Sequence, residues 1–178
     1  GCSQKFHGIA MLPNGALRAV GEDGTIIYKS ASSTNENWVQ ETFQSTVHLN
    51  AIDAFEDRFA LVGDKGTVAI HSDTEGWIIL PPPSFDALHA VRLLTAGRLV
   101  VGGPLGSLFL WDGEEWTTLN PTESFVGLRA LLGSRESKPL TALGHHEVYL
   151  GPLMDPPAMD RPTMTNPLGH PPVLEWTV

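Results

Sequence analysis

The sequence repeats itself about every 40 residues, and this repeat limits the possible folds more than any single motif does. A segment with a Gly-x-x-Gly turn followed by β-branched residues occurs at 18–27, 61–70 and 99–108, with a weaker copy at 140–149. A tryptophan follows each of the first three copies at a spacing of 39 residues: Trp38, Trp77 and Trp116. Such a repeat has to be treated as a structural unit before its residues are examined for chemistry.

Each unit predicts four short antiparallel strands. It begins with a tetrad of apolar, polar, small and apolar residues, at 6–9, 49–52, 88–91 and 128–131. A turn leads to the second strand, and in the first unit Asn14-Gly15 predicts a type I′ hairpin. The second strand ends in a reversal where glycine accepts the backbone, with the first glycine at 21, 63, 102 and 144. A third strand and a polar loop then lead to a fourth strand that starts at the tryptophan.

A sheet of this kind, apolar on both faces, needs a neighbouring sheet on each side. Radial stacking of four-stranded sheets is the β-propeller solution. The sequence therefore predicts an all-β propeller of about four blades, with repeats at about 6–48, 49–87, 88–127 and 128–150. The main alternative is a two-sheet sandwich, which gives no reason for the repeat. Residues 123–132 resemble a helix in isolation, but their register with the other tetrads predicts the start of a strand.

The two ends do not fit a whole number of blades. Residues 1–5 align with the links between units, and seven of the 14 prolines fall between 152 and 172. Proline removes a hydrogen-bond donor from a sheet, so 151–178 is predicted to be a linker with one possible extra strand at 173–178. That strand either starts a further blade or pairs back onto the first. This pattern favours a segment of a larger propeller over a closed four-bladed ring.

Charge and apolar content narrow the classes of partner. The 20 acidic and 11 basic residues give a net charge of −9, which argues against nucleic acid as a partner. No apolar run approaches the roughly 20 residues that span a bilayer, so no membrane span is predicted. Cys2 is the single cysteine. Gly1-Cys2 has the local form of a lipoprotein cleavage site, which would place a lipid anchor on Cys2; an incidental cysteine is the alternative.

The polar position of each tetrad gives the candidate ligand site. In a propeller the first strand of each blade lines the central channel, so these side chains should form a polar ring near one mouth: His7, Asn50, His89 and Arg129. Such a ring can bind an anionic group or a carboxylate side chain, and the alternative is solvation by channel water. No metal is predicted, because only two of the four positions are usual ligands. No cofactor is predicted either.

Several other residues have a structural interpretation. The cluster His145-His146-Glu147 is predicted to replace turn residues, because adjacent histidines point to opposite sides of a strand. The repeated tryptophans are predicted to pack between neighbouring sheets, whereas Trp111 breaks their register and is predicted to be exposed. The acidic residues at repeated turn positions are predicted to form local hydrogen bonds: Asp23, Asp64 and Asp112.

The run 19–27 followed by a tryptophan resembles the bacterial neuraminidase-type repeats of the photosystem II assembly-factor group of propellers. The resemblance covers about residues 6–150 and is weakest in the fourth unit. The related Asp-box signature is only approximated, at 72–77 and 112–116. The resemblance implies a secreted or periplasmic bacterial scaffold that binds proteins; a photosynthetic role is not carried over.

Among propellers with Asp-box turns, sialidases are the enzymes to consider. That family needs an arginine triad, a tyrosine paired with glutamate and a separate acid/base. This chain has only Tyr28 and Tyr149, both in strands away from the predicted channel, and it lacks the Phe/Tyr-Arg-Ile-Pro motif. The sequence thus predicts a non-catalytic binding or assembly scaffold with a protein partner. The alternatives are a glycan-binding or glycan-processing module and a structural spacer.

Overall fold

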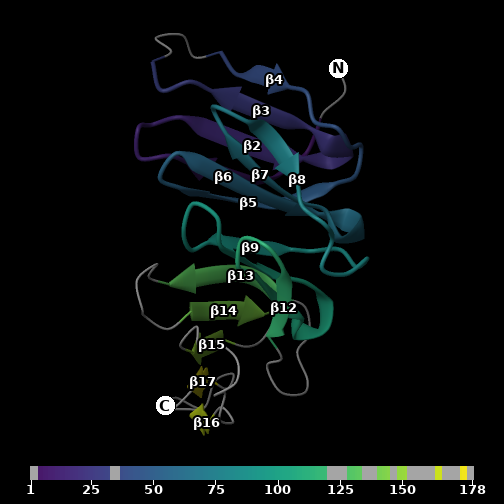
Figure 1. Cartoon of the computed structure of the whole chain (residues 1–178), viewed down its shortest axis with the longest axis vertical. Coiled ribbons are helices and arrows are strands. Elements are labelled where there is room, and N and C mark those ends of the chain that lie inside the picture. Colours follow the sequence, from purple (N-terminus) through teal and green to yellow (C-terminus); the bar gives the residue numbers. More distant parts are fainter. Residues whose placement is uncertain are drawn as a thin grey trace.

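Four β-sheets follow one another along the chain in the computed structural model (Figure 1). The structure describes residues 4–32, 37–119, 128–133, 140–144, 148–151, 163–165 and 173–175. The sheets are named blades 1 to 4 in chain order. The prediction of an all-β repeat fold is confirmed.

Blades 1 to 3 each contain four antiparallel strands in sequence order, as predicted. Blade 1 consists of β1 (Phe6–Met11), β2 (Leu17–Gly21), β3 (Ile26–Lys29) and β4 (Val39–Glu41). Blade 2 consists of β5 (Leu49–Phe55), β6 (Arg58–Gly63), β7 (Val68–Ser72) and β8 (Gly76–Ile79). Blade 3 consists of β9 (Ala90–Leu93), β10 (Leu99–Gly102), β11 (Leu108–Trp111) and β12 (Trp116–Leu119). The second and third strands are joined by one-turn reversals: η1 (Glu22–Gly24), η2 (Asp64–Gly66) and η3 (Pro104–Gly106).

Blade 4 departs from this pattern at its outer edge. It contains β13 (Leu128–Gly133), β14 (Leu140–Gly144), β15 (Val148–Gly151), β17 (Val173–Glu175) and β16 (Thr163–Thr165). The predicted extra strand forms as β17, but it pairs in parallel with β15 and so extends blade 4. It neither starts a further blade nor pairs with blade 1. The strand predicted at the fourth tetrad is confirmed as β13. The division of the chain at residue 150 stays a prediction.

The reversals explain why the repeat contains Gly-x-x-Gly. Gly24 and Gly66 both have φ of +68°, and a Cβ at either would collide with a carbonyl of the link to the next blade, Ser45 or Ser84. Their N–H groups donate to Val47 O at 2.8 Å and Asp86 O at 2.7 Å, respectively. The second glycine is therefore required by both its φ and its close approach to the link.

The register corrects one alignment of the turn glycines. The N–H groups of Gly21, Gly63 and Gly103 each donate to the carbonyl oxygen four residues ahead. Gly103, and not Gly102, is thus the equivalent of the first glycine. The adjacent glycines made the two positions indistinguishable by pattern alone.

The first hairpin also differs from its prediction. Gly15 has φ of +92°, but Asn14 is not among the residues with positive φ, so the turn is not type I′. Gly15 N–H donates to Leu12 O at 2.9 Å, which places Pro13 at the second position of the turn. Proline fixes φ near −65°, which suits a type I turn and forbids a positive φ at that position.

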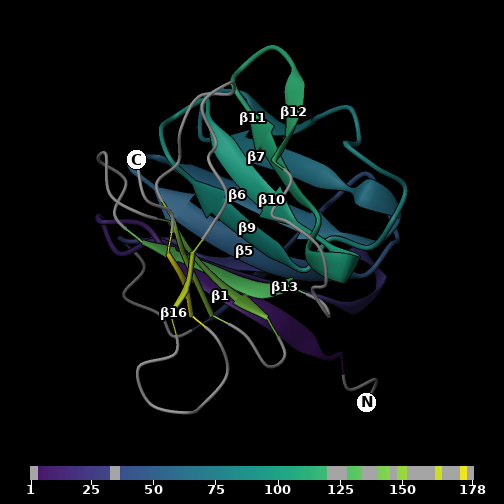
Figure 2. The same cartoon turned by 90° about the horizontal axis from the view of Figure 1, so that it is seen from below.

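The inner strands of the blades lie side by side in chain order: β1, β5, β9 and β13. Figure 2 views this series from the end at which blade 4 lies, so that the strands overlap. A Cβ at Gly8 would lie 3.3 Å from Ile52 N, which explains why the third residue of each tetrad is small. Blades 1 and 4 extend to opposite ends of the molecule (Figure 1). Within the described backbone, no comparably extensive contact joins β13 back to β1. The blades therefore form an open arc.

Apolar side chains fill the spaces between successive blades. Each blade has an onward face toward the next blade and a backward face toward the preceding one. Val20 and Ile26 on the onward face of blade 1 pack against Leu61 and Ala69 on the backward face of blade 2. Equivalent clusters join blade 2 to blade 3 and blade 3 to blade 4. The predicted neighbouring sheet on each side is confirmed for blades 2 and 3.

The tryptophans occupy equivalent positions in the register. Trp77 pairs with His71 and Trp116 pairs with Trp111, in each case across the third and fourth strands. Both repeated tryptophans pack against an inter-blade cluster, as predicted. The prediction that Trp111 is exposed is wrong: it is buried, with its ring centroid 5.2 Å from that of Trp116. In the described part of the chain, no helix is long and apolar enough to cross a membrane.

Candidate functional site

The predicted polar ring coincides with a β-bulge in three of the four inner strands. The register shifts at His7 in β1, at Asn50 in β5 and at Arg129 in β13. The bulge turns the polar residue out of the regular ladder. His7 Nδ1 lies 3.0 Å from Leu49 O, and Asn50 Nδ2 donates to Leu88 O at 3.0 Å. Each side chain thus binds the first tetrad residue of the next blade.

These contacts give two of the four candidate residues a structural role. Asn50 Nδ2 also donates to Asp64 Oδ1 at 2.9 Å, which ties the inner strand to reversal η2. His89 is half-buried, and its backbone N–H donates to Gly102 O at 2.8 Å. The side chain of Arg129 lies outside the described residues. Ligand binding by the ring stays a prediction.

The other residues that could bind a metal ion or carry a lipid are not placed by the structure. The cluster at 145–147 and Cys2 lie outside the described residues. Among those described, no group of three or more His, Cys, Asp or Glu side chains is placed to hold a metal ion.

The acidic turn residue of blade 3 forms the predicted local hydrogen bonds. Asp112 Oδ1 accepts from Glu114 N at 2.8 Å and from Glu115 N at 2.9 Å. These backbone hydrogen bonds, led by that from Glu115, lower the pKa of the Asp112 carboxyl. The conformation of the turn between β11 and β12 is therefore fixed by a charged side chain.

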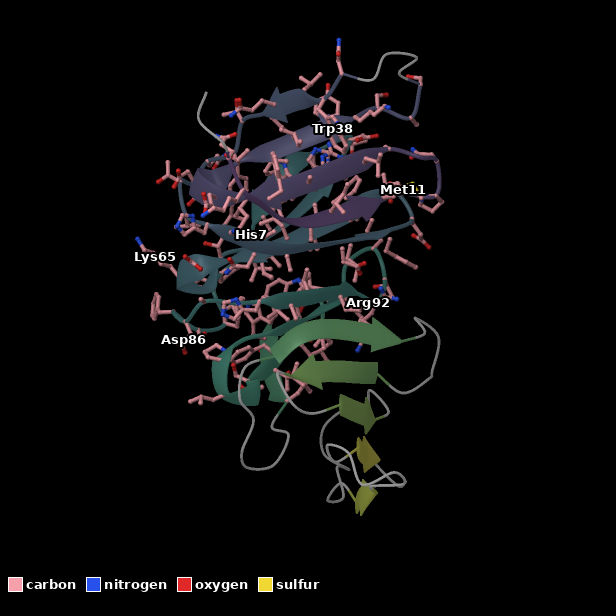
Figure 3. The ribbon with its side chains drawn as sticks, turned by 180° about the vertical axis from the view of Figure 1, so that it is seen from behind. His7, Met11, Trp38, Lys65, Asp86 and Arg92 are labelled. Carbon is pink, nitrogen blue, oxygen red and sulfur yellow. The ribbon has the colours of Figure 1, made fainter. Side chains whose placement is uncertain are left out.

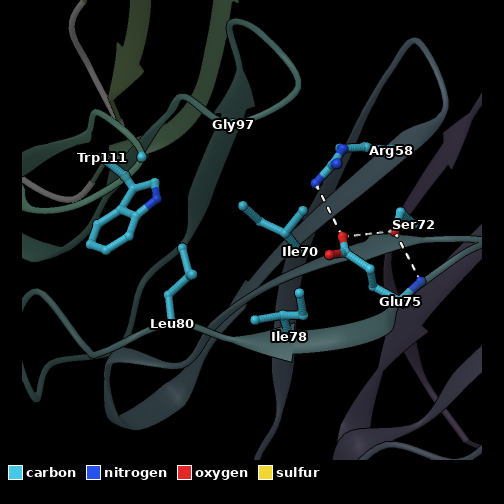
Figure 4. Close-up of a pocket in the computed structure, with 9 residues that line it drawn as sticks. Arg58, Ile70, Ser72, Glu75, Ile78, Leu80, Gly97 and Trp111 are labelled. Atoms are coloured by element: carbon cyan, nitrogen blue, oxygen red, sulfur yellow. Dashed lines mark hydrogen bonds and ion pairs between the residues drawn. The ribbon is translucent and has the colours of Figure 1, made fainter.

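A groove lies between blades 2 and 3 (Figure 4). Its volume is about 180 Å³. Ile70, Ile78 and Leu80 from the onward face of blade 2 form one side, and Trp111 from blade 3 faces them. Gly97 and Gly113 lie in the adjoining hairpin turns of blade 3, where the absence of side chains keeps the groove open.

One end of the groove is polar. Arg58 Nη1 lies 3.8 Å from Glu75 Oε2 in an ion pair. Ser72 Oγ donates to Glu75 Oε2 at 3.2 Å, and Glu75 N donates to Ser72 Oγ at 3.3 Å (Figure 4). These contacts fix the β7–β8 turn, whereas Arg58 Nε is buried without a hydrogen-bond partner among the described residues.

The rim of the groove carries an excess of negative charge. The two hairpin turns that flank it contain five acidic residues: Asp73, Glu75, Asp112, Glu114 and Glu115. The nearby basic residues are Arg58, which is paired with Glu75, and Arg98, whose charge acts on Asp112. An opposite charge on a ligand would be attracted to this rim.

The corresponding space between blades 1 and 2 is filled by a polar network. Arg18 Nε donates to Glu41 Oε2 at 3.0 Å, and Arg18 Nη2 lies 3.0 Å from His71 Nε2. His71 Nε2 is in turn 3.5 Å from Glu41 Oε1. Burial raises the pKa of Glu41, but the contacts with His71 and Arg18 lower it by more, to about 2. The network therefore contains a carboxylate that stays ionised.

Sequence reasoning did not find the groove. Arg18 and Ala60 occupy equivalent positions in their blades, because each lies three residues before the first turn glycine and pairs across to the third strand. A small residue thus replaces a long one at the same position of the next blade. This difference is visible when the repeats are aligned, and it is the sequence feature that could have indicated the groove.

Two other hollows lie at the surface. One of about 440 Å³ lies beside β4 and is lined largely by polar residues, among them Thr25, Gln40 and Thr46. Another of about 290 Å³ lies between the first hairpins of blades 1 and 2, at Met11 and Phe55. The groove between blades 2 and 3 differs from the first of these in its apolar floor, and from the second because it lies between the facing surfaces of two blades.

No protein-family model and no curated protein sequence matches the chain. Several solved structures share its fold. YCF48 from Cyanidioschyzon merolae matches with a TM-score of 0.63 and 13% identity, over 81% of this chain and 49% of that one. The WD40 repeats of RRP9 match with a TM-score of 0.61 and 15% identity, over 79% of this chain and 46% of that one. The fold of the chain is thus that of a β-propeller segment.

Two further structures extend the comparison. YCF48 bound to a D1 peptide matches with a TM-score of 0.58 and 17% identity, over 78% of this chain and 47% of that one. The computationally designed protein Ika4 matches with a TM-score of 0.60 and 17% identity, over 82% of this chain and 88% of that one. The chain spans just under half the length of the YCF48 and RRP9 structures.

Proposed function

We propose that this chain is a non-catalytic scaffold that binds a segment of a partner protein in the groove between blades 2 and 3. The observation that carries the proposal is the apolar floor of that groove, where Ile78 is 44% exposed although it faces a neighbouring blade. An exposed apolar surface in a concave site is a typical binding feature.

The size of the groove defines what it holds. Its volume of about 180 Å³ is close to that of a cavity of roughly 150 Å³ that accepts benzene. Pockets for small-molecule ligands usually measure about 300–1,000 Å³. The groove therefore fits one large apolar side chain of a peptide, which packs between Ile78 and Trp111. A single anchor of this kind can dominate binding.

The charge of the rim defines the flanking residues of that peptide. The acidic turns at 73–75 and 112–115 would attract lysine or arginine on either side of the anchor. The partner segment is thus a basic, extended stretch with one large apolar residue. Exposed charges of this kind are screened by salt, so the affinity falls as ionic strength rises.

The lining of the groove argues against catalysis and against a glycan ligand. Among the residues that line it, Ser72 supplies the hydroxyl, and that oxygen is already bonded to Glu75. No histidine lies among them to act as a base. A sugar needs many hydrogen-bond partners, whereas the floor offers Ile70, Ile78 and Leu80.

We also propose that the protein works in a bacterial cell envelope or outside the cell. The resemblance of its repeats to secreted propellers supports this location, and Gly1-Cys2 would supply a site for a lipid anchor. Fractionation of the source cells tests the location, and mass spectrometry of the N-terminal peptide tests the lipid. A cytoplasmic protein with an unmodified cysteine would contradict it.

The test of binding selects peptides from a random display library against the immobilised chain. Selected peptides are expected to combine basic residues with one aromatic or large aliphatic residue. Their affinity for Ile78→Asp should fall about tenfold or more, because the anchor loses its apolar contact. Ile79→Asp is the matched control: Ile79 is also 44% exposed but lies on the other face of β8.

Five results would overturn the proposal or part of it. Selected peptides could be acidic or lack a common anchor, or Ile78→Asp and Ile79→Asp could bind them equally well. Binding on a glycan array that Ile78→Asp abolishes would assign the groove to sugars instead. Turnover of a sialoside by the purified chain would contradict the non-catalytic assignment.

A further inference from the structure

Strand β8 forms a free edge of blade 2. It is the last strand in the order β5-β6-β7-β8, and among the described residues it pairs with β7 alone. Leu80 N donates to Val68 O at 2.9 Å, in register with the rest of the β7–β8 pairing. In an antiparallel ladder, hydrogen-bonded pairs alternate with pairs whose N–H and C=O groups point away from each other. The backbone groups of Trp77 and Ile79 therefore point outward from the edge of the sheet.

β8 lacks the features that usually protect an edge strand. Such strands commonly carry a charged side chain, a proline or a bulge. In β8 there is no charged residue and no proline, and its register with β7 is unbroken. By contrast, the outer strand β4 contains Glu41, and the outer strand β12 contains two threonines. Ile78 and Ile79 are also 44% exposed on the two faces of β8. The strand is thus open along its edge and apolar on both sides.

This free edge adjoins the groove between blades 2 and 3. Ile78 belongs to the groove floor, together with Ile70 of the neighbouring strand. Because side chains alternate along a strand, the residue of an added strand that lies opposite Ile78 points to the same side. The residues before and after it lie opposite Trp77 and Ile79, whose backbone groups face outward. One segment can therefore place a side chain in the groove and form main-chain hydrogen bonds with β8.

We propose that the partner segment binds as an additional antiparallel strand on β8. The inference rests on the proposed function, because the anchor is the apolar residue that enters the groove. When a strand is added to an exposed sheet edge, main-chain hydrogen bonds give affinity and a side-chain pocket gives specificity. The antiparallel direction continues the order of blade 2 and is the slightly more stable pairing. The partner has to supply an extended segment whose own backbone is unpaired.

The two ends of β8 limit the added strand. The turn before β8 contains Asp73 and Glu75, which attract a lysine or arginine on the C-terminal side of the anchor. After Leu80 come prolines 81–83, which have no N–H to donate. The link then passes reversal η2, whose last N–H donates to Asp86 O at 2.7 Å; Figure 3 shows Asp86 and Lys65 of this reversal on one side of the molecule. The added strand is therefore short, with its basic end at the β7–β8 turn.

The experiment scans a selected peptide with single N-methyl groups. The peptide comes from the selection against the chain, and its large apolar residue marks the anchor. An N-methyl group on the residue before or after the anchor should weaken binding about fivefold or more, because it removes a hydrogen bond to β8 and places a methyl group against the edge. N-methylation of the anchor itself is the matched control. It should leave the affinity nearly unchanged, because that N–H points away from β8.

A variant of the chain tests the same hydrogen bonds from the other side. Ile79→Pro removes an outward N–H of β8 and keeps the ladder with β7, since an edge strand accepts proline where the nitrogen faces away from its neighbour. Ile79→Ala is the control, because it shortens the same side chain and retains the N–H. Ile79→Pro should bind the peptide about fivefold or more weakly than Ile79→Ala. Matching circular dichroism spectra would show that both variants keep the fold.

The outcomes separate this inference from the proposed function. A peptide that Ile78→Asp rejects, but whose affinity does not depend on the site of N-methylation, would keep the groove as its site and overturn the added strand. Loss of binding from N-methylation of the anchor alone would overturn the antiparallel direction. Self-association of the chain that Ile79→Pro abolishes would assign the edge to a second copy and overturn the proposal. If Ile78→Asp binds as well as the unaltered chain, the proposed function itself fails.

Discussion

Arg18 donates its Nε hydrogen to Glu41 Oε2 at 3.0 Å, inside the interface between blades 1 and 2. The Arg18 guanidinium also lies 4.6 Å from the centroid of the Phe59 ring. In blade 2, Ala60 occupies the position that Arg18 has in blade 1. Leu80, directly after β8, likewise occupies the position of Glu41, the last residue of β4. The same repeat thus builds a filled polar interface at one place and an open apolar groove at the next.

The Glu41 carboxylate makes the stability of the protein dependent on acid pH. Its pKa is about 2 in the folded chain against an ordinary 4.5. Because the folded value is lower, the stabilisation is complete above about pH 4.5 and is lost as the pH falls toward 2. The difference corresponds to on the order of 3 kcal/mol. Urea unfolding between pH 7 and 2 should show this loss, and Glu41→Gln should flatten the pH dependence over that range.

Removal of Arg18 alone should be more harmful than joint removal of Arg18 and Glu41. Arg18→Met leaves Glu41 buried without its cation, which typically costs about 3–5 kcal/mol of unfolding free energy. The combined change Arg18→Met with Glu41→Met should recover most of that loss, because no unpaired charge remains. Urea unfolding at neutral pH measures both. Equal losses in the single and double variants would show that packing, and not charge, accounts for the effect.

Much of this fold could be predicted from the sequence because the repeat encodes contacts between units. The Gly-x-x-Gly turns, the small third residue of the tetrad and the repeated tryptophans each reflect an inter-blade contact at a fixed register. Turn type was less predictable, since Pro13 outweighs the Asn14-Gly15 pair. The parallel pairing of β17 with β15 could not be predicted, because it has no counterpart in the other units.

The candidate site was harder to predict, because it arises from a departure from the repeat. The polar tetrad positions drew attention because they recur, and two of them hold neighbouring blades together. Trp111 lies outside the tryptophan register, which predicts exposure, yet it pairs across the sheet with Trp116. The relevant comparison was between units at one position, where Arg18 gives way to Ala60.

Two glycines allow the stability cost of a left-handed backbone to be distinguished from the cost of a steric collision. Gly66 and Gly76 have similar φ values of +68° and +70°. A Cβ at Gly66 would collide with the Ser84 carbonyl, whereas a Cβ at Gly76 would have no atom within 4 Å. Gly76→Ala should therefore cost about 1–2 kcal/mol, from the left-handed backbone alone. Gly66→Ala should cost clearly more, because the link to blade 3 must also move. Chemical denaturation compares the two variants, and equal costs would contradict the close approach of the link to Gly66.

The Asn50 amide should be replaceable by neither alanine nor aspartate. Asn50→Ala removes hydrogen bonds to Leu88 O and Asp64 Oδ1 and should cost about 1–3 kcal/mol. Asn50→Asp should cost more at neutral pH, because it places a second carboxylate against Asp64. Its deficit relative to Asn50→Ala should shrink in acid, as the new carboxyl is protonated. Thermal unfolding at pH 7 and pH 4 tests this order; an equal deficit at both values would argue against repulsion.

The acidic rim of the groove should control the salt dependence of peptide binding. Glu114→Gln combined with Glu115→Gln removes two exposed charges and leaves Asp112, which holds the turn, in place. The double variant should bind basic peptides more weakly at low salt and lose affinity less steeply as salt is added, because fewer charge contacts remain to be screened. Its stability should change little, since both side chains are exposed. The control is Glu22→Gln with Asp23→Asn, an equal change of charge in the blade 1 reversal. If both double variants have the same salt dependence, the affinity follows net charge and not the rim.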